Sequence, residues 1–146
     1  MRLTTKMRYG TRAMLDLALH HNGGPTSLKD IAERQNVSLK YLERLFATLQ
    51  ASGLVRGIRG AHGGYLLSEP PEKVTLRQLY ETLEGSNPLV DCTSDPQVCD
   101  RSERCVTLGG WAQLYDVCME TVESITLDDL VHRTEQLEGQ PGMYYI

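Results

Sequence analysis

Long apolar runs are absent from this sequence of 146 residues. No stretch approaches the roughly 18 consecutive apolar residues that a membrane-spanning helix needs. The first twenty residues carry Arg2, Lys6, Arg8 and Arg12 among polar positions, which is not the pattern of a secretory signal. We therefore expect a cytoplasmic protein. Because disulfides rarely persist in the cytosol, its four cysteines should act as thiols, metal ligands or redox groups.

A catalytic constellation is likewise absent, so we do not expect an enzyme. The length fits one domain rather than two sizeable cores. The net charge of −4 conceals a strong asymmetry. Residues 1–67 hold ten basic against four acidic side chains, a charge of +6, whereas the remaining 79 residues hold five against fifteen, a charge of −10. The basic part predicts a polyanion-binding face, and a chance imbalance between two ordinary surfaces is the alternative.

The order of elements in residues 1–70 predicts a winged helix-turn-helix. Apolar residues recur three times with helical spacing, and two short apolar runs then flank a glycine-rich tip, as in a β-hairpin. Helix, helix, tight turn, helix and hairpin is the order of that motif. We therefore expect a mainly α fold with a small β-hairpin wing. The expected elements are helices at residues 3–21, 28–35 and 38–52, a turn at Asn36–Val37, and hairpin strands at 54–58 and 65–67.

The helix expected at 38–52 has the pattern of a DNA-recognition helix. Its expected buried face consists of Leu39, Leu42, Phe46 and Leu49. The opposite face then offers polar side chains to base edges and phosphates, and Arg59 at the glycine-rich tip suits a narrow minor groove. Each charge alone is equally consistent with an ordinary surface residue, but together they favour DNA binding. The candidate DNA-binding residues are Ser38, Lys40, Tyr41, Glu43, Arg44, Arg59 and Gly60.

Three cysteines, Cys92, Cys99 and Cys105, lie in or beside a loop that follows a connecting helix expected from Thr75 to Glu84. A loop of roughly twenty residues is unusual in a compact domain unless a ligand organises it. Thiolates are the soft, anionic donors that iron–sulfur clusters need. A C-x-x-C pair, which structural zinc sites usually contain, is missing, and pairing of the thiols on oxidation is a further alternative. The spacing favours a cluster over a thiol–disulfide switch, and a switch over zinc.

The residues beyond the cysteines predict a dimerisation helix. Apolar positions alternate between spacings of three and four, as in a heptad seam. The seam consists of Leu108, Trp111, Tyr115, Cys118, Val122 and Ile125. Because we expect no second long helix in the chain, the seam should pack against a second copy, with Cys118 as a small, inert, buried residue. The expected divisions are the winged helix-turn-helix at 1–70, a connecting helix and cysteine loop at 71–103, a dimerisation helix and short last helix at 104–135, and a disordered tail at 136–146.

The sequence resembles the IscR-type iron–sulfur cluster regulators over residues 1–130. The resemblance rests on MRLTTKMRYGTRAMLDLAL, SLKYLERLFATLQASGLVRGIRG, GGYLL, the three-cysteine loop, Trp111 and ITLDDLV. It implies a homodimer with crossed long helices, whose heads bind the two halves of a palindromic operator in double-stranded DNA. It also implies an iron–sulfur cluster beside the first helix of the partner subunit, with 2Fe–2S favoured and 4Fe–4S as the alternative. Cys92, Cys99 and Cys105 match the thiolate ligands, Glu43 matches an acidic residue linked to site discrimination, and Arg59 matches the wing arginine.

The chain departs from the family pattern at several positions. Leu108 stands where some members have a histidine ligand, and Arg8 stands where related nitric-oxide sensors have an acidic residue. Lys40 and Arg44 replace residues that are commonly smaller or amides, which bears on the operator sequence. The fourth ligand is thus left open among loop acids, a partner side chain, solvent and a small thiol. The loop acids are Asp91, Asp95, Asp100 and Glu103.

The resemblance and the residues together predict a cluster-sensing transcriptional regulator, a repressor of iron–sulfur biogenesis genes. Within the same fold, the alternatives are a nitric-oxide- or iron-responsive repressor and a thiol-redox switch without a cluster. Outside that class of sensor, the alternatives are a repressor with structural zinc and an iron–sulfur electron carrier. The basic part of the chain and the glycine-rich tip argue against the electron carrier.

Overall fold

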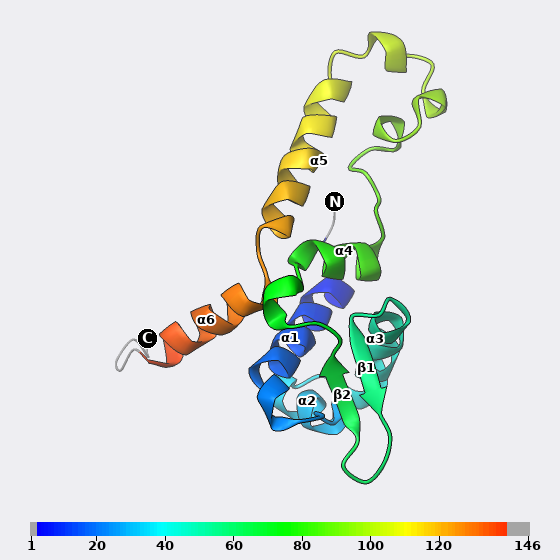
Figure 1. Cartoon of the computed structure of the whole chain (residues 1–146). Helices are drawn as coiled ribbons and strands as arrows, with labels where there is room; N and C mark the ends of the chain where they lie inside the picture. Colours follow the sequence, from blue (N-terminus) through cyan, green and yellow to red (C-terminus); the bar gives the residue numbers. More distant parts are fainter. Residues whose placement is uncertain (1–2, 140–146) are drawn as a thin grey trace.

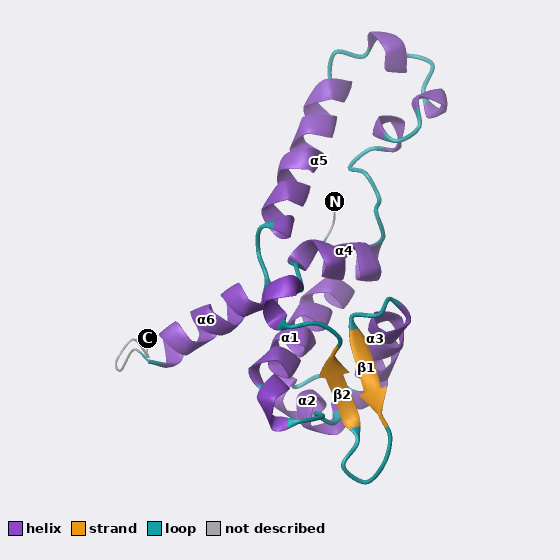
Figure 2. Ribbon diagram, viewed as in Figure 1, coloured by secondary structure: helices purple, strands orange, loops and turns teal. Residues whose placement is uncertain are grey.

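The computed structural model describes residues 3–139, which contain six α-helices and one β-hairpin at the edge of the molecule (Figure 2). The helices are α1 (Thr5–Leu19), α2 (Leu28–Gln35), α3 (Leu39–Ala51), α4 (Leu76–Glu84), α5 (Leu108–Glu123) and α6 (Leu127–Glu138), and the strands are β1 (Val55–Ile58) and β2 (Gly64–Leu67). We call residues 3–67 the head. It contains helix, helix, turn, helix and hairpin in the predicted order, which confirms the winged-helix fold. None of the helices in the described part of the chain is long and apolar enough to cross a membrane.

Side-chain caps start five of the helices, because each first turn leaves backbone N–H groups without partners. The capping residues are Thr4, Ser27, Ser38, Thr75 and Thr126. At Thr75 and Thr126 the sequence spacing of a capping box gives a complete one, because the third residue of each helix bonds back to the backbone of the cap. At Ser27 the hydroxyl accepts from the backbone N–H of Asp30 at 3.1 Å.

The core of the head lies between α1, α2 and α3. Ala13, Met14 and Leu17 of α1 are fully buried, in one cluster with Ile31 of α2 and Phe46 of α3. This is the apolar face that the helical spacing predicted for α1. The contacts of this face with α2 and α3 fix the position of the turn at Asn36. Asn36 takes the left-handed conformation, with φ 52°, that ends α2.

One residue of the predicted recognition-helix face was assigned wrongly. Leu39 is 40% exposed, whereas Leu45, which the prediction omitted, is 4% exposed. The cause is that the first turn of α3 extends out of the head, so that residues 38–40 all face solvent. The buried stripe therefore begins at Leu42, one turn later than the spacing suggested.

The wing is tied to the head at its base. β1 and β2 pair antiparallel with Val55 opposite Leu67, and Tyr65 exchanges two backbone hydrogen bonds of 3.0 and 2.8 Å with Thr26 in the loop before α2. Gly64 makes this approach possible, because a Cβ there would lie 2.4 Å from the carbonyl oxygen of Thr26. The two-stranded hairpin is therefore joined to the head by an isolated antiparallel bridge between Tyr65 and Thr26.

A second part of the molecule extends away from the head (Figure 1). In that view the cysteine-containing loop runs from the end of α4 up to the far end of α5, α5 returns toward α4, and α6 projects sideways. Two backbone hydrogen bonds, from Leu76 to Ile125 at 2.9 Å and from Leu127 to Val74 at 2.8 Å, tie the α5–α6 turn to the start of α4. Not one of residues 85–118, all of them described, is buried.

Three further expectations need correction. The chain does contain a second long helix, because α1 has 15 residues against the 16 of α5, although α1 is already enclosed in the head. The predicted seam also outruns α5, which ends at Glu123, so Ile125 lies in the following turn. Finally, α6 continues to Glu138, three residues beyond the predicted end at Glu135. Residues 140–146 of the predicted tail lie outside the described residues.

Candidate nucleic-acid interface and cysteine segment

The first turns of α3 present the charged side chains that sequence analysis assigned to DNA. Lys40, Glu43 and Arg44 are all exposed. The hydroxyl of Ser38 caps the helix by accepting from the backbone of Tyr41 at 3.2 Å, and Ser38 itself remains exposed. An exposed N-terminal half on a helix whose other face is buried is the arrangement with which helix-turn-helix proteins enter the major groove.

Tyr41 differs from the other candidates. Its ring meets the ring of Tyr9 edge-on, with 6.0 Å between centroids, and the guanidinium of Arg12 lies 5.5 Å from the Tyr9 centroid. The Tyr41 hydroxyl is buried and has no hydrogen-bond partner among the described residues. A phosphate contact from Tyr41 would therefore require the ring to turn outward, and its present role is to join α3 to α1.

The wing places two arginines near the end of α3. Arg59 and Gly60 lie in the exposed tip, where Gly60 takes a φ of 117° that suits glycine. Arg56, exposed on β1, was not among the sequence candidates, although its place two residues inside the first apolar run of the hairpin was a usable signal. A shallow depression of about 340 Å³ separates the wing from Gln50 at the end of α3.

Residues 85–107, which we call the cysteine segment, are organised by three short 3-10 helices. These are Asp91–Thr93, Pro96–Val98 and Ser102–Arg104. Cys92 lies within the first, while Cys99 and Cys105 directly follow the second and third. All three cysteines are free thiols of intermediate exposure, as is Cys118 on α5. The segment is thus built from local turns, each of which carries one sulfur.

Cys105 lies within hydrogen-bond distance of a neighbouring hydroxyl group. Its sulfur lies 3.2 Å from the hydroxyl of Thr107, just before α5 begins at Leu108. Hydrogen bonds from the side chain and backbone of Thr107, and from the backbone of Leu108, lower the pKa of the Cys105 thiol. A thiolate is the form that binds metal or attacks a disulfide.

The cysteine segment fits an iron–sulfur cluster in the kind and number of its protein donors. It does not gather them, because within residues 3–139 no three histidine, cysteine or acidic side chains lie together in a way that could hold a metal ion. Closing the three turns around one centre would require the segment to rearrange. Nothing buried resists that rearrangement, since the segment contributes no residue to the core.

The outer face of α5 is apolar, and no described residue covers it. Trp111, Leu114 and Val117 are 47%, 48% and 51% exposed. Tyr115 and Val122 of the predicted seam instead pack against the core of their own chain. Leu114 and Val117 were not predicted, because the heptad pattern selected a neighbouring face of the same helix. The signal that was missed is the regular spacing of three residues from Trp111 to Leu114 and from Leu114 to Val117.

An apolar groove of about 390 Å³ runs along the base of α5. It lies between α1, the start of α4 and the end of α5. Its lining consists of Leu3, Met7, Arg8, Thr11, Arg12, Leu15, Leu76 and Val122. Arg8, the position where related sensors have an acid, therefore lies at the rim of a mostly apolar surface rather than beside the cysteine segment of its own chain.

A winged helix with a basic head, an exposed recognition helix and a braced wing defines a DNA-binding protein. The chain belongs to the Rrf2 family, described as iron-dependent transcriptional regulators, whose model matches residues 3–133. It is therefore a transcriptional regulator and not an enzyme.

Relatives with different names resemble this chain almost equally. The HTH-type transcriptional regulator IscR of Pectobacterium carotovorum is 41% identical over 138 residues, which cover 94% of this chain and 84% of the relative. The HTH-type transcriptional regulator CymR of Bacillus subtilis is 39% identical over the whole of both chains. Among solved structures, T. potens IscR superposes with a TM-score of 0.79 at 38% identity, covering 99% of this chain and 97% of the other.

Proposed function

We propose that this regulator senses iron–sulfur supply by binding a cluster through Cys92, Cys99 and Cys105. The observation that carries the proposal is a segment with three half-exposed thiols and no buried residue to hold it. Ordering each residue of such a segment costs about 1–2 kcal/mol, which burial in this chain does not offset. A ligand that binds all three sulfurs would supply that free energy. The similarity to proteins named IscR supports the same assignment.

The end of α4 links the cysteine segment to the head. The ammonium of Lys6 donates to the backbone carbonyl of Leu83 at 2.8 Å, and the hydroxyl of Thr4 bonds to the carboxylate of Glu84. The cysteine segment starts at the next residue, Gly85. A shift of the segment would therefore displace the first turn of α1. α1 in turn contacts the recognition helix through the Tyr9–Tyr41 ring pair. When bound, a cluster adds a redox-active and oxygen-sensitive centre to the segment that this connection joins to the head.

We further propose a homodimer on a palindromic operator in double-stranded DNA. The exposed face of α5 is the proposed contact, with Leu108, Trp111 and Cys118 from the predicted seam and Leu114 and Val117 beside them. Two heads joined in this way would meet successive half-sites. The proposal has three further parts. The cluster is of the 2Fe–2S form, the regulator represses iron–sulfur biogenesis genes, and it acts in the cytoplasm, where the DNA lies.

The test is anaerobic purification of the full chain, followed by absorption spectra and by iron and sulfide analysis. DNA affinity is then compared with and without cluster at one salt concentration, on a duplex selected from a random-sequence library by the wild-type protein. Cys92→Ser, Cys99→Ser and Cys105→Ser should each lose colour and the difference in affinity. Cys118→Ser, outside the segment, controls for the loss of a thiol and should keep the colour. A colourless, iron-free protein that binds the selected duplex normally would refute the cluster.

A thiol switch is the second candidate function. It is favoured by the free thiols, by the lowered pKa of Cys105 and by the similarity to CymR, which a solved structure describes as a global cysteine regulator. In the same experiment this candidate predicts colourless protein whose affinity for DNA changes when a mild oxidant is added. Mass spectrometry would then show loss of two hydrogens between two of the three cysteines.

A further inference from the structure

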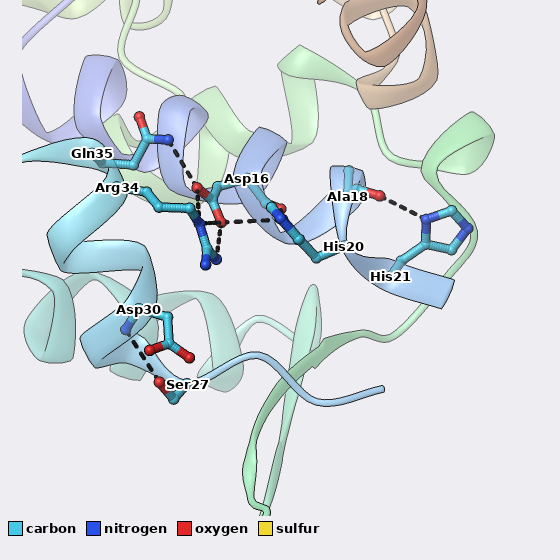
Figure 3. A network of polar contacts seen from close by, with 8 residues as sticks. All are labelled: Asp16, Ala18, His20, His21, Ser27, Asp30, Arg34 and Gln35. Atoms are coloured by element: carbon cyan, nitrogen blue, oxygen red, sulfur yellow. Dashed lines mark hydrogen bonds and ion pairs between the residues drawn. The ribbon is translucent and has the colours of Figure 1, made fainter. Parts of the chain in front are cut away.

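A buried carboxylate joins α1 to the end of α2 (Figure 3). Asp16 is 3% exposed. Its two oxygens accept four hydrogen bonds from the last two residues of α2: three from Arg34, at 2.6, 3.0 and 3.1 Å, and one from Gln35, at 2.9 Å. The ring of His20 lies close by, with Nδ1 at 3.5 Å from the carboxylate and 2.7 Å from the backbone oxygen of Asp16. The hydrogen bond to Asp16 raises the pKa of Arg34.

The hydrogen bonds around Asp16 fix the relative orientation of α1 and α2 and contribute little to the free energy of unfolding. Removing a carboxylate from water is costly, so a buried ion pair commonly gives no more stability than apolar residues of similar size. Charge-assisted bonds to a guanidinium fork do, however, fix the angle and distance between their partners. The apolar contacts between α1 and α2 are non-directional, so they constrain the angle between the two helices less tightly than these bonds do.

The bonded residues lie where a small displacement is passed directly to DNA. After Gln35, only Asn36, Val37 and Ser38 separate the network from the first residue of α3. The left-handed Asn36 and the bond of 3.0 Å from the Val37 amide to Ala32 make this turn stiff. A change in the direction of α2 at its end therefore becomes a change in the direction of the recognition helix.

A second bond set from α1 acts on the same point. Arg12, one helical turn before Asp16, donates to the side-chain oxygen of Gln35 at 3.1 Å and to its backbone oxygen at 2.7 Å. The backbone bond also satisfies a carbonyl that the end of α2 leaves open. Two successive turns of α1 thus hold the last residue of α2 from both its side chain and its backbone.

We infer that Asp16 is a positioning residue for DNA recognition: through Arg34 and Gln35 it sets the orientation in which α3 meets the bases. The inference depends on DNA binding by the head and is independent of what the cysteine segment senses. Asp16 touches no DNA in this role, and neither does Arg34, whose fork is already engaged by the carboxylate. The alternative is that Arg34 contacts a phosphate.

The test compares wild type with the double variant Asp16→Leu, Arg34→Met, which removes the network without leaving a buried charge unpaired. Affinity is measured for the selected duplex and for a scrambled duplex of equal composition, over a series of salt concentrations. We expect an unchanged thermal midpoint and salt slope, and a fall of about tenfold in the ratio of the two affinities. Arg34→Lys, which keeps the charge but lacks the bidentate fork, should lower the same ratio in a protein that folds normally.

Lys29→Met is the matched control, because Lys29 is an exposed cation on the same helix that is outside the network. It should leave the ratio of affinities unchanged. An unchanged ratio in folded forms of both network variants would overturn the inference. A salt slope that becomes shallower by about one unit in the double variant would also overturn it, because that result assigns Arg34 to a phosphate.

Discussion

Gly64 illustrates how a single missing side chain fixes the position of the wing. Its φ of 153° and its approach to the backbone of Thr26 leave no room for a Cβ. The bridge that joins the hairpin to the loop before α2 depends on that approach. At the residue scale, the angle of the wing to α3 is thus decided by backbone packing, while Arg56 and Arg59 supply its charge.

Gly64→Ala should destabilise the head by about 1–3 kcal/mol, because the strand must move away from Thr26 or accept overpacking. Denaturant unfolding measures the change, and DNA affinity should fall with it, since the wing loses its brace. Gly110→Ala in α5 is the control, because a Cβ there meets nothing within 4 Å. It should be neutral or slightly stabilising. Equal effects of the two substitutions would contradict this role for Gly64.

The capping box of α6 predicts a defined pH dependence. The amide and hydroxyl of Thr126 bond to the carboxylate of Asp129 at 2.8 and 2.9 Å, and these bonds lower the pKa of Asp129 in the folded chain. A lowered folded pKa means that the contribution to stability is complete above the unfolded pKa of about 3.9 and is lost as the pH falls through the folded value.

Wild type should therefore be more stable than Asp129→Asn at neutral pH, and the gap should close as the pH falls below about 4. Urea midpoints of both proteins across that range measure it. A gap that stayed constant down to pH values well below 4 would mean that the charge of Asp129 does not act in the cap.

At the scale of elements, α4 is the joint between the head and the rest of the chain. It packs on α1, where a Cβ on Gly10 would lie 2.4 Å from a methyl group of Leu83. The bond from Lys6 to the carbonyl of Leu83 fixes the same end. Since the cysteine segment begins two residues later, the proposed sensor and the first helix of the head share one anchor.

Lys6→Met should weaken that joint without unfolding the head, because Lys6 is an exposed side chain. We expect normal cluster absorbance, together with a ratio of loaded to unloaded DNA affinity that shrinks by about fivefold or more. Lys29→Met again controls for the lost positive charge. If the Lys6 variant forms the cluster and its ratio of loaded to unloaded DNA affinity equals that of wild type, the coupling through α4 is wrong. Loss of the cluster itself would count against the proposed sensor.

Sequence patterns predicted the elements of the head well because their signals are local. Caps such as Ser38 and Thr75 mark where helices begin, and helical spacing selects the buried face of α1. The phase of α5 was harder, because Leu114 and Tyr115 are both apolar neighbours and only tertiary packing decides which faces inward. The 3-10 turns around Cys92 and Cys99 have no periodicity at all. The bonds from Asp16 to α2 cross 18 and 19 residues, and no local pattern announces them.

At the scale of the whole molecule, a single chain leaves an apolar surface on its most extended helix. Three large side chains of α5 are about half exposed, and an apolar groove lies at its base. Large apolar patches on one subunit mark interaction sites. Residues 68–146 carry a net charge of −10, which disfavours contact between this part of the chain and the phosphates of DNA.

Leu114→Asp should convert the proposed dimer to a monomer, because it places a charge in the centre of that face. Sedimentation measures the mass, and affinity for the selected duplex should fall by at least about tenfold, since each head then binds one half-site alone. Gln113→Asp adds the same charge at an exposed neighbouring position and should remain dimeric. A dimeric Leu114 variant with unchanged affinity would place the interface elsewhere.

The absence of any buried residue between positions 85 and 118 has a consequence for the life of the protein in a cell. If the proposed cluster binds, copies without it would expose this stretch of chain to cellular proteases, and copies with it would be protected there. Turnover would then follow occupancy, and the number of regulator molecules, as well as their state, would report the supply of iron and sulfide.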